Sequence, residues 1–216
     1  MKKNLFKRMA MVCIGTFIMG FAVSLSVYAR LGTDPCTCIN TGLSRVFGMS
    51  FGLWQLIMNS IVLVFTFFFA RSKIGFGTVV NMVAIGFLVD FFSWLFTFFL
   101  PPAPSLPLRI ACMLLGVSIL AFTAALYMYP RLGVSPYDSI GFMLMKCFHT
   151  QYRWCRIGYD VLAVVIGGLS GGVVGVGTVI TAFCMGPLIK LFTDRMPEWF
   201  PLEFGKADGN YRKSAE

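Results

Sequence analysis

The sequence predicts an all-α, polytopic helical membrane protein built from two repeated halves, and three observations support this fold class. Hydrophobic residues make up 57% of the 216-residue chain and charged residues only 12%, whereas a soluble domain is typically about half apolar and about a quarter charged. Basic residues border the long apolar runs, as membrane insertion requires. The segment R-L-G-T-D-P at 30–35 recurs as R-L-G-V-S-P at 131–136, which indicates an internal repeat.

The repeat extends along both halves of the chain. The run G-F-G-T-V at 75–79 pairs with G-V-G-T-V at 175–179. Matched positions include Gly, Pro, Arg and Thr, which a shared apolar composition would not favour. We therefore divide the chain into a first membrane repeat at 1–100, a proline-rich linker at 101–109, a second membrane repeat at 110–194 and a polar C-terminal tail at 195–216.

Each half begins with an apolar run that is long enough to cross a bilayer, which takes roughly 20 residues. The first run covers 9–28 and its counterpart covers 110–129. The first run follows four basic residues and resembles a signal peptide. Because its counterpart lies in the middle of the chain, where no signal peptide can be, we expect both runs to be membrane spans.

A short helix follows in each half, at 34–47 and 135–148. Each opens with an N-cap residue and a proline at the first helical position, as Asp34-Pro35 and Ser135-Pro136. Helices of this length are about 21 Å long, which is short for a hydrocarbon core of roughly 30 Å. We expect half-helices that dip into the protein or lie at the membrane interface.

Two further spans complete each half, at 51–70 and 77–100 in the first and at 154–169 and 177–192 in the second. Polar residues occupy matched positions within them. Gln55 and Asn59 correspond to Arg156 and Asp160, an i,i+4 pair whose charges can neutralise each other, and Asp90 corresponds to Lys190.

Three spans in a half is an odd number, so the second half should be inverted relative to the first. With both termini in the cytoplasm, every Lys and Arg residue except Arg30, Arg45 and Arg109 falls in an inner segment, in agreement with the positive-inside rule. If the short helices cross completely, the halves become parallel four-span units, and the rule is still satisfied. We favour the inverted arrangement because the short segments are short and polar.

Inverted repeats with short or broken helices are the usual construction of secondary transporters, in which helix N-termini face an anionic group near the midplane. The predicted substrate-binding residues lie at the two helix starts and on the adjoining polar helix faces: Arg30, Gly32, Asp34, Pro35, Arg131, Gly133, Ser135, Pro136, Gln55, Asn59, Arg156 and Asp160. Asp90 and Lys190 are candidates for ion coupling or for an ion pair between the repeats. The structural alternatives are arginines that snorkel to lipid headgroups, helix caps and interhelical hydrogen bonds.

Other classes of function have little support in the sequence. The net charge of +9 follows from the insertion signals, so we expect no nucleic-acid partner. The cysteines are odd in number and lie mostly in or beside apolar segments, where they act as small hydrophobes. Cys36 and Cys38 form a C-x-C pair, but the single histidine, His149, lies in the other half, so we expect no metal site and no cofactor. No catalytic constellation is present, and we expect no enzyme, although a membrane-embedded enzyme stays open.

The chain resembles the bacterial YczE/YyaS/YitT family of membrane proteins in four places. These are the R-x-G-x-x-P segment, the G-L-S-x-x-x-G-x-S-x-G stretch from Gly42 to Gly52, Asn59, and the I-G-x-G-T element from Ile74 to Thr78. The similarity covers nearly the whole chain and is clearest in the first half, because the second half has H-T-Q at 149–151 in place of the glycine-rich turn. The resemblance implies a protein of the bacterial cytoplasmic membrane with a suspected transport function.

We therefore expect a small secondary transporter or facilitator of an anionic or zwitterionic solute, with the lipid bilayer as its surroundings. A homo-oligomer is compatible with the sequence. The alternative is a non-catalytic membrane partner or regulatory subunit of another complex, which the small size of the chain also allows.

Overall fold

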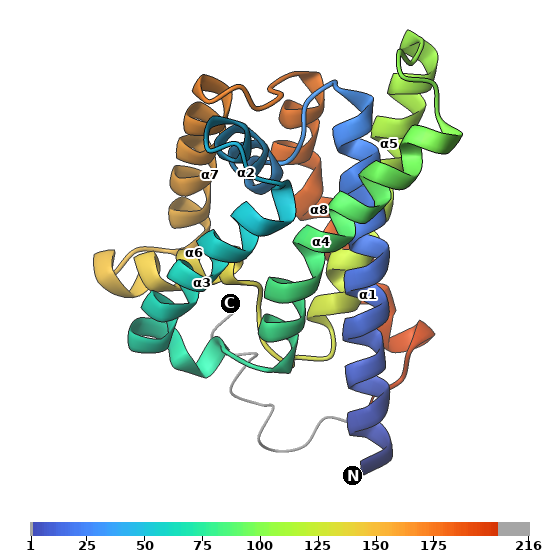
Figure 1. Ribbon diagram of the computed structural model, residues 1–216. Helices are drawn as coiled ribbons and strands as arrows, with labels where there is room; N and C mark the ends of the chain where they lie inside the picture. Colours follow the sequence, from blue (N-terminus) through green and yellow to red (C-terminus); the bar gives the residue numbers. More distant parts are fainter. Residues whose placement is uncertain (1, 203–216) are drawn as a thin grey trace.

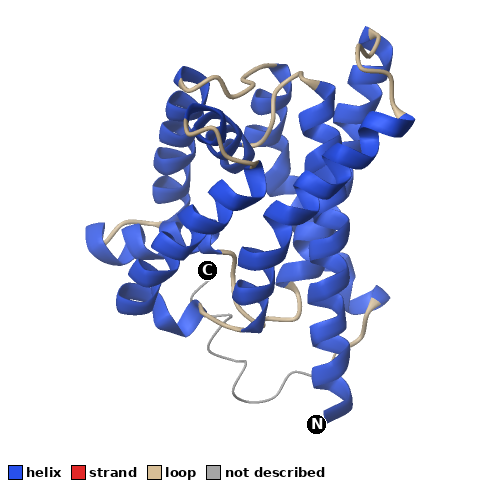
Figure 2. Ribbon diagram, viewed as in Figure 1, coloured by secondary structure: helices blue, strands red, loops and turns tan. Residues whose placement is uncertain are grey.

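The computed structural model describes residues 2–202, and every regular element in that part of the chain is a helix (Figures 1 and 2). The predicted all-α class is confirmed. In chain order the helices are α1 (Lys2–Ala29), α2 (Pro35–Val46), α3 (Phe51–Ala70), the 3₁₀ turn η1 (Arg71–Lys73), α4 (Phe76–Phe99), α5 (Leu106–Met128), α6 (Pro136–Phe148), α7 (Tyr152–Leu169) and α8 (Val176–Trp199). Helix α8 continues beyond the predicted repeat boundary at 194, and the predicted tail from 203 onward lies outside the described residues.

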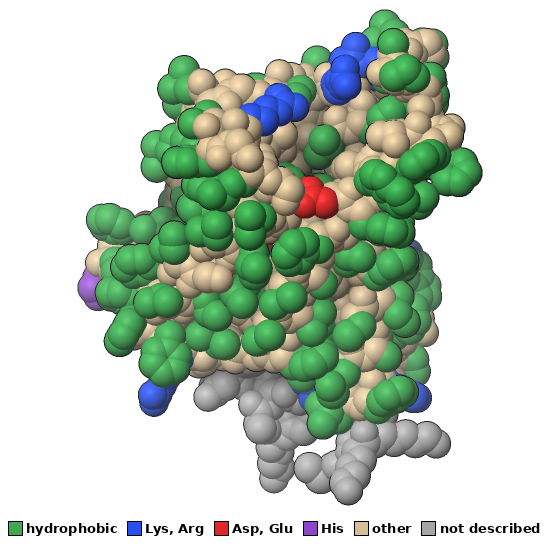
Figure 3. Space-filling view, viewed as in Figure 1, with side chains coloured by type: hydrophobic (Ala, Val, Ile, Leu, Met, Phe, Trp, Pro, Cys, Tyr) green, Lys and Arg blue, Asp and Glu red, His purple; other side chains and the backbone are tan. Residues whose placement is uncertain are grey.

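Within the described residues, five helical segments are long and apolar enough to cross a membrane: Asn4–Ala29, Phe51–Lys73, Phe76–Phe99, Leu106–Met128 and Val176–Trp199. Helix α7, which we predicted as a sixth span, is not among them. It has 18 residues and carries Arg153, Arg156 and Asp160, and these charges reduce its hydropathy. In Figure 3 apolar side chains cover the middle of one face of the molecule, and basic side chains lie towards both ends.

The two short helices begin as predicted, because each is capped by the side chain before its proline. Asp34 Oδ2 accepts a hydrogen bond from the Thr37 amide at 3.1 Å. Ser135 Oγ accepts one from the Asp138 amide, also at 3.1 Å. With 12 residues in α2 and 13 in α6, each helix is about 20 Å long at 1.5 Å per residue.

Helices α1 and α5 pack against each other, α4 packs on α1, and α8 packs on α5. Two glycines at matched positions permit the close approach of α1 and α5. A Cβ atom on Gly116 would lie 2.5 Å from Ser26 Oγ, and one on Gly15 would lie 3.3 Å from the Tyr127 amide nitrogen. The short helices pack across the halves, α2 on α7 and α6 on α3.

The N-terminus of α1 and the linker between α4 and α5 lie at opposite ends of the molecule (Figure 1). We call these the N-terminal end and the linker end. The first loop, residues 30–34, is at the linker end, where Arg109 Nε donates a hydrogen bond to the Ala29 carbonyl at 2.8 Å. The second loop, residues 129–135, is at the N-terminal end, where Arg8 Nε donates one to the Pro130 carbonyl, also at 2.8 Å.

This placement predicts which side of the membrane each end occupies. In a cysteine-free background, we expect Ser105→Cys in intact cells to react with a membrane-impermeant maleimide, because the linker end is external when the N-terminus is cytoplasmic. Lys7→Cys should react only after the cells are permeabilised. Equal labelling of both positions from outside, or labelling of neither without permeabilisation, would contradict this topology.

Candidate functional site

The two loops that follow α1 and α5 share an unusual backbone conformation. Arg30 and Arg131 have φ angles of 51° and 54°, and Gly32 and Gly133 have φ angles of 109° and 116°. Positive φ is uncommon for residues other than glycine. One arginine and one glycine with positive φ recur in each copy of the motif, which shows that the two copies form the same turn.

Each loop is hydrogen-bonded to the first turn of a long helix in the other half of the chain. The carbonyl of Leu31, in the first loop, accepts a hydrogen bond from the Gly177 amide of α8 at 2.8 Å. The carbonyl of Leu132, in the second loop, accepts one from the Gly77 amide of α4, also at 2.8 Å. The first amides of a helix lack acceptors within the helix, so the loops satisfy groups that would be costly to leave unpaired in a membrane.

The loop glycines are required for this docking. A Cβ atom on Gly32 would lie 2.7 Å from Thr178 Oγ1, and one on Gly133 would lie 2.5 Å from Thr78 Oγ1. Thr78 Oγ1 also donates a hydrogen bond to the Val134 carbonyl at 2.8 Å. Gly32 and Gly133, which we predicted as site residues, therefore lie where each loop packs against a helix. Their surroundings leave no room for a solute.

The starts of α2 and α6 converge on a cluster of charged and phenolic side chains. Burial raises the pKa of Asp34, and the nearby charge of Asp160 on α7 raises it further, although the hydrogen bonds with Thr37 lower it. The pKa of the Cys36 thiol is raised well above its usual value, first by burial and then by the carboxylates around it, including Asp138 on α6. Helices α2 and α6 both pack on α7, which brings their N-terminal turns near the charged residues of α7.

Arg156 of α7 is the centre of this cluster. Its Nη1 atom lies 2.5 Å from Asp138 Oδ1 and its Nε atom lies 3.2 Å from Asp160 Oδ2. Asp160 Oδ1 accepts a hydrogen bond from the Tyr137 hydroxyl at 2.7 Å, and Arg156 Nη1 donates to the Tyr152 hydroxyl at 3.1 Å. The predicted pairing of Arg156 with Asp160 is confirmed. The part played by Asp138 and the tyrosines was not predicted.

The charges of the cluster do not balance. Two carboxyl groups, those of Asp138 and Asp160, contact the single guanidinium of Arg156, and the N-terminal dipoles of α2 and α6 offset part of the excess negative charge. The side chain of Arg156 is 38% exposed and those of its two ion-pair partners 21% and 24%. The cluster is therefore partly accessible.

A small cavity of about 80 Å³ adjoins the cluster between α2, α3 and α6. Its polar wall consists of Asn40, Asn59 and Tyr137, and the remainder is apolar. Asn40 Nδ2 donates a hydrogen bond to the Cys36 carbonyl at 2.9 Å. Asn59, which we predicted as a site residue, therefore does lie beside the helix starts.

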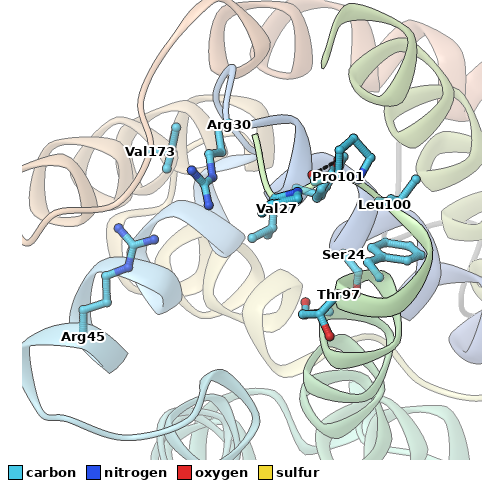
Figure 4. Close-up of a pocket in the computed structure, with 12 residues that line it drawn as sticks. Ser24, Val27, Arg30, Arg45, Thr97, Leu100, Pro101 and Val173 are labelled. Carbon is cyan, nitrogen blue, oxygen red and sulfur yellow. Dashed lines mark hydrogen bonds between the residues drawn. The ribbon is translucent and has the colours of Figure 1, made fainter. Parts of the chain in front are cut away.

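A larger cavity of about 610 Å³ opens at the linker end, and we call it the linker-end cavity. Arg30 and Arg45 lie on one side of it and the ends of α1 and α4 on the other (Figure 4). Its lining residues are Ser24, Val27, Tyr28, Arg30, Arg45, Ser93, Phe96, Thr97, Leu100, Pro101, Pro102 and Val173. In Figure 3, basic side chains border a hollow at this end of the molecule. Arg45 was not among the predicted site residues.

Several predicted site residues are not brought together. Arg30 and Arg131 lie in loops at opposite ends of the molecule (Figure 1), so they do not share one solute site. Gln55 is buried between α3 and α4, where a Cβ atom on Gly86 would lie 3.2 Å from its Oε1 atom. Pro35 and Pro136 occupy first-turn positions of their helices.

The predicted ion pair between Asp90 and Lys190 is absent from the described residues. Asp90 Oδ2 instead accepts a hydrogen bond from the Gly52 amide of α3 at 2.9 Å, and Lys190 is exposed on α8. These two matched sequence positions therefore do not meet. Among the residues from 2 to 202, no group of three His, Cys, Asp or Glu side chains is placed to hold a metal ion.

The apolar helices, with basic residues towards both ends of the molecule, define a polytopic helical membrane protein. The chain belongs to the family of unknown function DUF6198, which matches residues 6–194. It is 29% identical over 191 residues to the uncharacterised membrane protein YczE of Bacillus subtilis strain 168, covering 88% of this chain and 87% of the relative. The resemblance found in the sequence is confirmed.

Two further relatives are similar over most of their length. An uncharacterised protein of Haemophilus influenzae is 27% identical over 187 residues, which cover 87% of this chain and 84% of the relative. The uncharacterised protein YyaS of Bacillus subtilis is 25% identical over 183 residues, which cover 83% of this chain and 89% of the relative. No solved structure matches the chain.

The loop docking predicts a matched pair of destabilising substitutions. Gly32→Ala and Gly133→Ala should each destabilise the protein by roughly 1–3 kcal/mol, because the added methyl group meets the docked helix and the backbone has positive φ. The melting temperature in detergent, followed by fluorescence-detected gel filtration, should fall by several degrees. Gly158→Ala and Gly186→Ala meet open space and serve as controls. Equal melting temperatures for all four variants would rule out this role of the loops.

The Arg156 cluster predicts a double-mutant coupling. Arg156→Gln leaves two carboxylates without their counter-charge and should destabilise the protein by roughly 2 kcal/mol, between the values for exposed and for buried pairs. In the Arg156→Gln background, Asp138→Asn should recover part of that loss, whereas Asp138→Asn alone should destabilise. The unfolding free energies of the four proteins measure the coupling, and additive effects would show that the pair contributes no specific interaction.

Proposed function

We propose that the protein carries a small polar solute across the bacterial cytoplasmic membrane, as a secondary transporter or facilitator. The first support is the charged cluster at the junction of α2, α6 and α7. Placing an ionisable side chain within the membrane costs free energy, so such residues are characteristic of ion and solute pathways. Asp34, Asp138, Arg156 and Asp160 come from three different elements, and a structural ion pair would not need all of them.

The second support is the relation between the two halves. The matched loops lie at opposite ends of the molecule (Figure 1), and each docks on the last long helix of the other half. This is the arrangement that an inverted repeat would produce, with both termini cytoplasmic. Transporters built in this way place their solute site where the two repeats meet and where discontinuous helices end.

The observation that carries the proposal is that matched residues pack in apolar clusters at both ends, but those at the linker end also border an open cavity. At the linker end, Tyr28 and Phe96 line the linker-end cavity, and Phe96 also packs in an apolar cluster with Leu25 and Phe92. Their counterparts by repeat position, Tyr129 and Met196, belong to an apolar cluster with Met11, in which Met196 is completely buried. Two equivalent surfaces in different states are what alternating access requires.

On this proposal the present structure is open at the linker end and closed at the N-terminal end. The second conformation would close the linker-end cavity and open the cluster around Met196, by rocking of one repeat against the other. The solute would pass between the starts of α2 and α6. An anionic or zwitterionic solute fits this path, and the excess of carboxylates in the central cluster favours the zwitterion.

The test is accessibility at both ends of the protein in a cysteine-free background. We expect Thr97→Cys, in the linker-end cavity, to react with an impermeant maleimide from outside. Met196→Cys should react from the cytoplasmic side, slowly but measurably, because the closed cluster opens during the cycle. Ala22→Cys, which is also completely buried but lies in the α1 packing core, should stay unlabelled.

The same experiment separates a carrier from a static membrane subunit. In a carrier, a bulky adduct at Thr97→Cys should hold the linker-end cavity open and lower the labelling rate of Met196→Cys at least several-fold. In a static subunit, Met196→Cys should be as unreactive as Ala22→Cys under all conditions. That second result would remove the basis for the transport proposal.

A further inference from the structure

The linker-end cavity brings two arginines from different elements to one space. Arg30 lies in the first loop, and Arg45 lies near the end of α2. Figure 4 shows both guanidinium groups directed into the space between them. No Asp or Glu side chain is among the residues that line the cavity. No carboxylate therefore lines the cavity itself, and Figure 3 shows one acidic side chain beside the hollow.

A hydrogen bond holds the side chain of Arg45, and another holds the main chain of Arg30. Arg45 Nη1 donates a hydrogen bond to the Gly171 carbonyl at 2.6 Å, which ties it to the loop between α7 and α8. Arg30 has a left-handed backbone, and its carbonyl accepts a hydrogen bond from Arg109 Nη2 at 2.6 Å. A glycine or an asparagine would adopt the Arg30 conformation more readily, so the backbone does not explain why an arginine stands there.

The remaining wall of the cavity is mainly apolar in character. Phe96, Leu100 and Pro101 contribute carbon surface. The Tyr28 hydroxyl donates to the Pro101 carbonyl at 2.7 Å, and the Thr97 hydroxyl donates to the Trp94 carbonyl at 2.7 Å. These two hydroxyl groups already donate their hydrogen atoms to the backbone. The charged side chains that line the cavity are those of Arg30 and Arg45, so we expect their guanidinium groups to recognise a ligand.

We propose that the linker-end cavity is a binding site for an organic anion, with its carboxylate or phosphate group between Arg30 and Arg45 and its apolar body against Phe96 and Pro101. Guanidinium groups bind both kinds of anion through charge-assisted hydrogen bonds. The volume of about 610 Å³ is within the usual range of small-molecule sites, about 300–1,000 Å³. The inference deepens the proposed function, because it makes this cavity the place where the solute is first bound.

A lipid could supply the same chemistry as a free solute. A phospholipid carries a phosphate group on an apolar body, and the cavity lies at one end of the membrane-spanning helices. The experiment therefore uses nanodiscs of two compositions, one with only zwitterionic phosphatidylcholine and one with added anionic phosphatidylglycerol. The soluble probes are hexyl phosphate and hexanoate.

In phosphatidylcholine nanodiscs, we expect isothermal titration calorimetry to show saturable binding of at least one probe by the full-length protein. Arg30→Asn and Arg45→Gln should each weaken that binding about tenfold or more, because each removes a charged hydrogen-bond donor. Asparagine suits the left-handed backbone at position 30, so Arg30→Asn should fold. Arg30→Lys should restore part of the affinity.

Arg131→Asn is the matched control, because Arg131 has nearly the same φ angle as Arg30 but does not line the cavity. It should leave probe affinity unchanged. The anion is a lipid headgroup if phosphatidylglycerol abolishes probe binding to the native protein and raises the melting temperature of the native protein. In that case phosphatidylglycerol should not raise the melting temperature of Arg30→Asn. If probe binding survives the anionic lipid, the anion is a free solute.

Two results would overturn the inference. One is that neither probe binds and that phosphatidylglycerol changes the melting temperature of native protein and Arg30→Asn equally. The other is that Arg131→Asn weakens binding as much as Arg30→Asn does. Binding at equilibrium is independent of movement across the membrane. If the probes do not bind but Met196→Cys is labelled from the cytoplasmic side, only this binding site is rejected. If the probes bind but Met196→Cys stays unlabelled, only the transport proposal is rejected.

Discussion

The structure depends on two hydrogen bonds between backbone groups, from Gly77 to Leu132 and from Gly177 to Leu31. A helix that begins within a membrane protein has amide groups without acceptors, and lipid offers none. Each R-x-G loop supplies the missing acceptor by turning through positive φ. Since each bond joins a loop of one half to a helix of the other, neither half can satisfy its own helix start. Each half therefore completes a helix start of the other half.

This exchange of contacts also explains how a charged cluster can exist within the protein. The loops stop α1 and α5 and start α2 and α6, which are too short to span the membrane. Their N-terminal turns end inside the protein, so their capping residues Asp34 and Ser135 lie beside α7 and α6 side chains and away from lipid. Helix α7 provides Arg156 and Asp160 at this depth. These charged residues lower the hydropathy of α7, so it is not among the helices that are apolar enough to cross a membrane.

Part of the site could be predicted from the sequence. The duplicated motif identified the two loops, the Asp-Pro and Ser-Pro pairs identified the helix starts, and the i,i+4 spacing identified the Arg156–Asp160 pair. Asp138 and Tyr137 were missed because they meet Arg156 across a helix boundary, where spacing in the sequence carries no information. Arg45 was also missed, although a signal existed: with Arg30 and Arg109, it is an exception to the positive-inside distribution, and all three lie at the linker end.

The sequence by itself determined the membrane class, the helices with their caps, the repeat motif and the family. Hydropathy, capping and turn formation act over a few residues, so they can be recognised locally. Only the tertiary structure decided that Arg30 and Arg131 lie far apart (Figure 1), that Asp90 contacts α3 in place of Lys190, and that Arg30 and Arg45 line one cavity. These outcomes depend on the rotation and crossing of each helix, which are set by side-chain packing between segments distant in the chain.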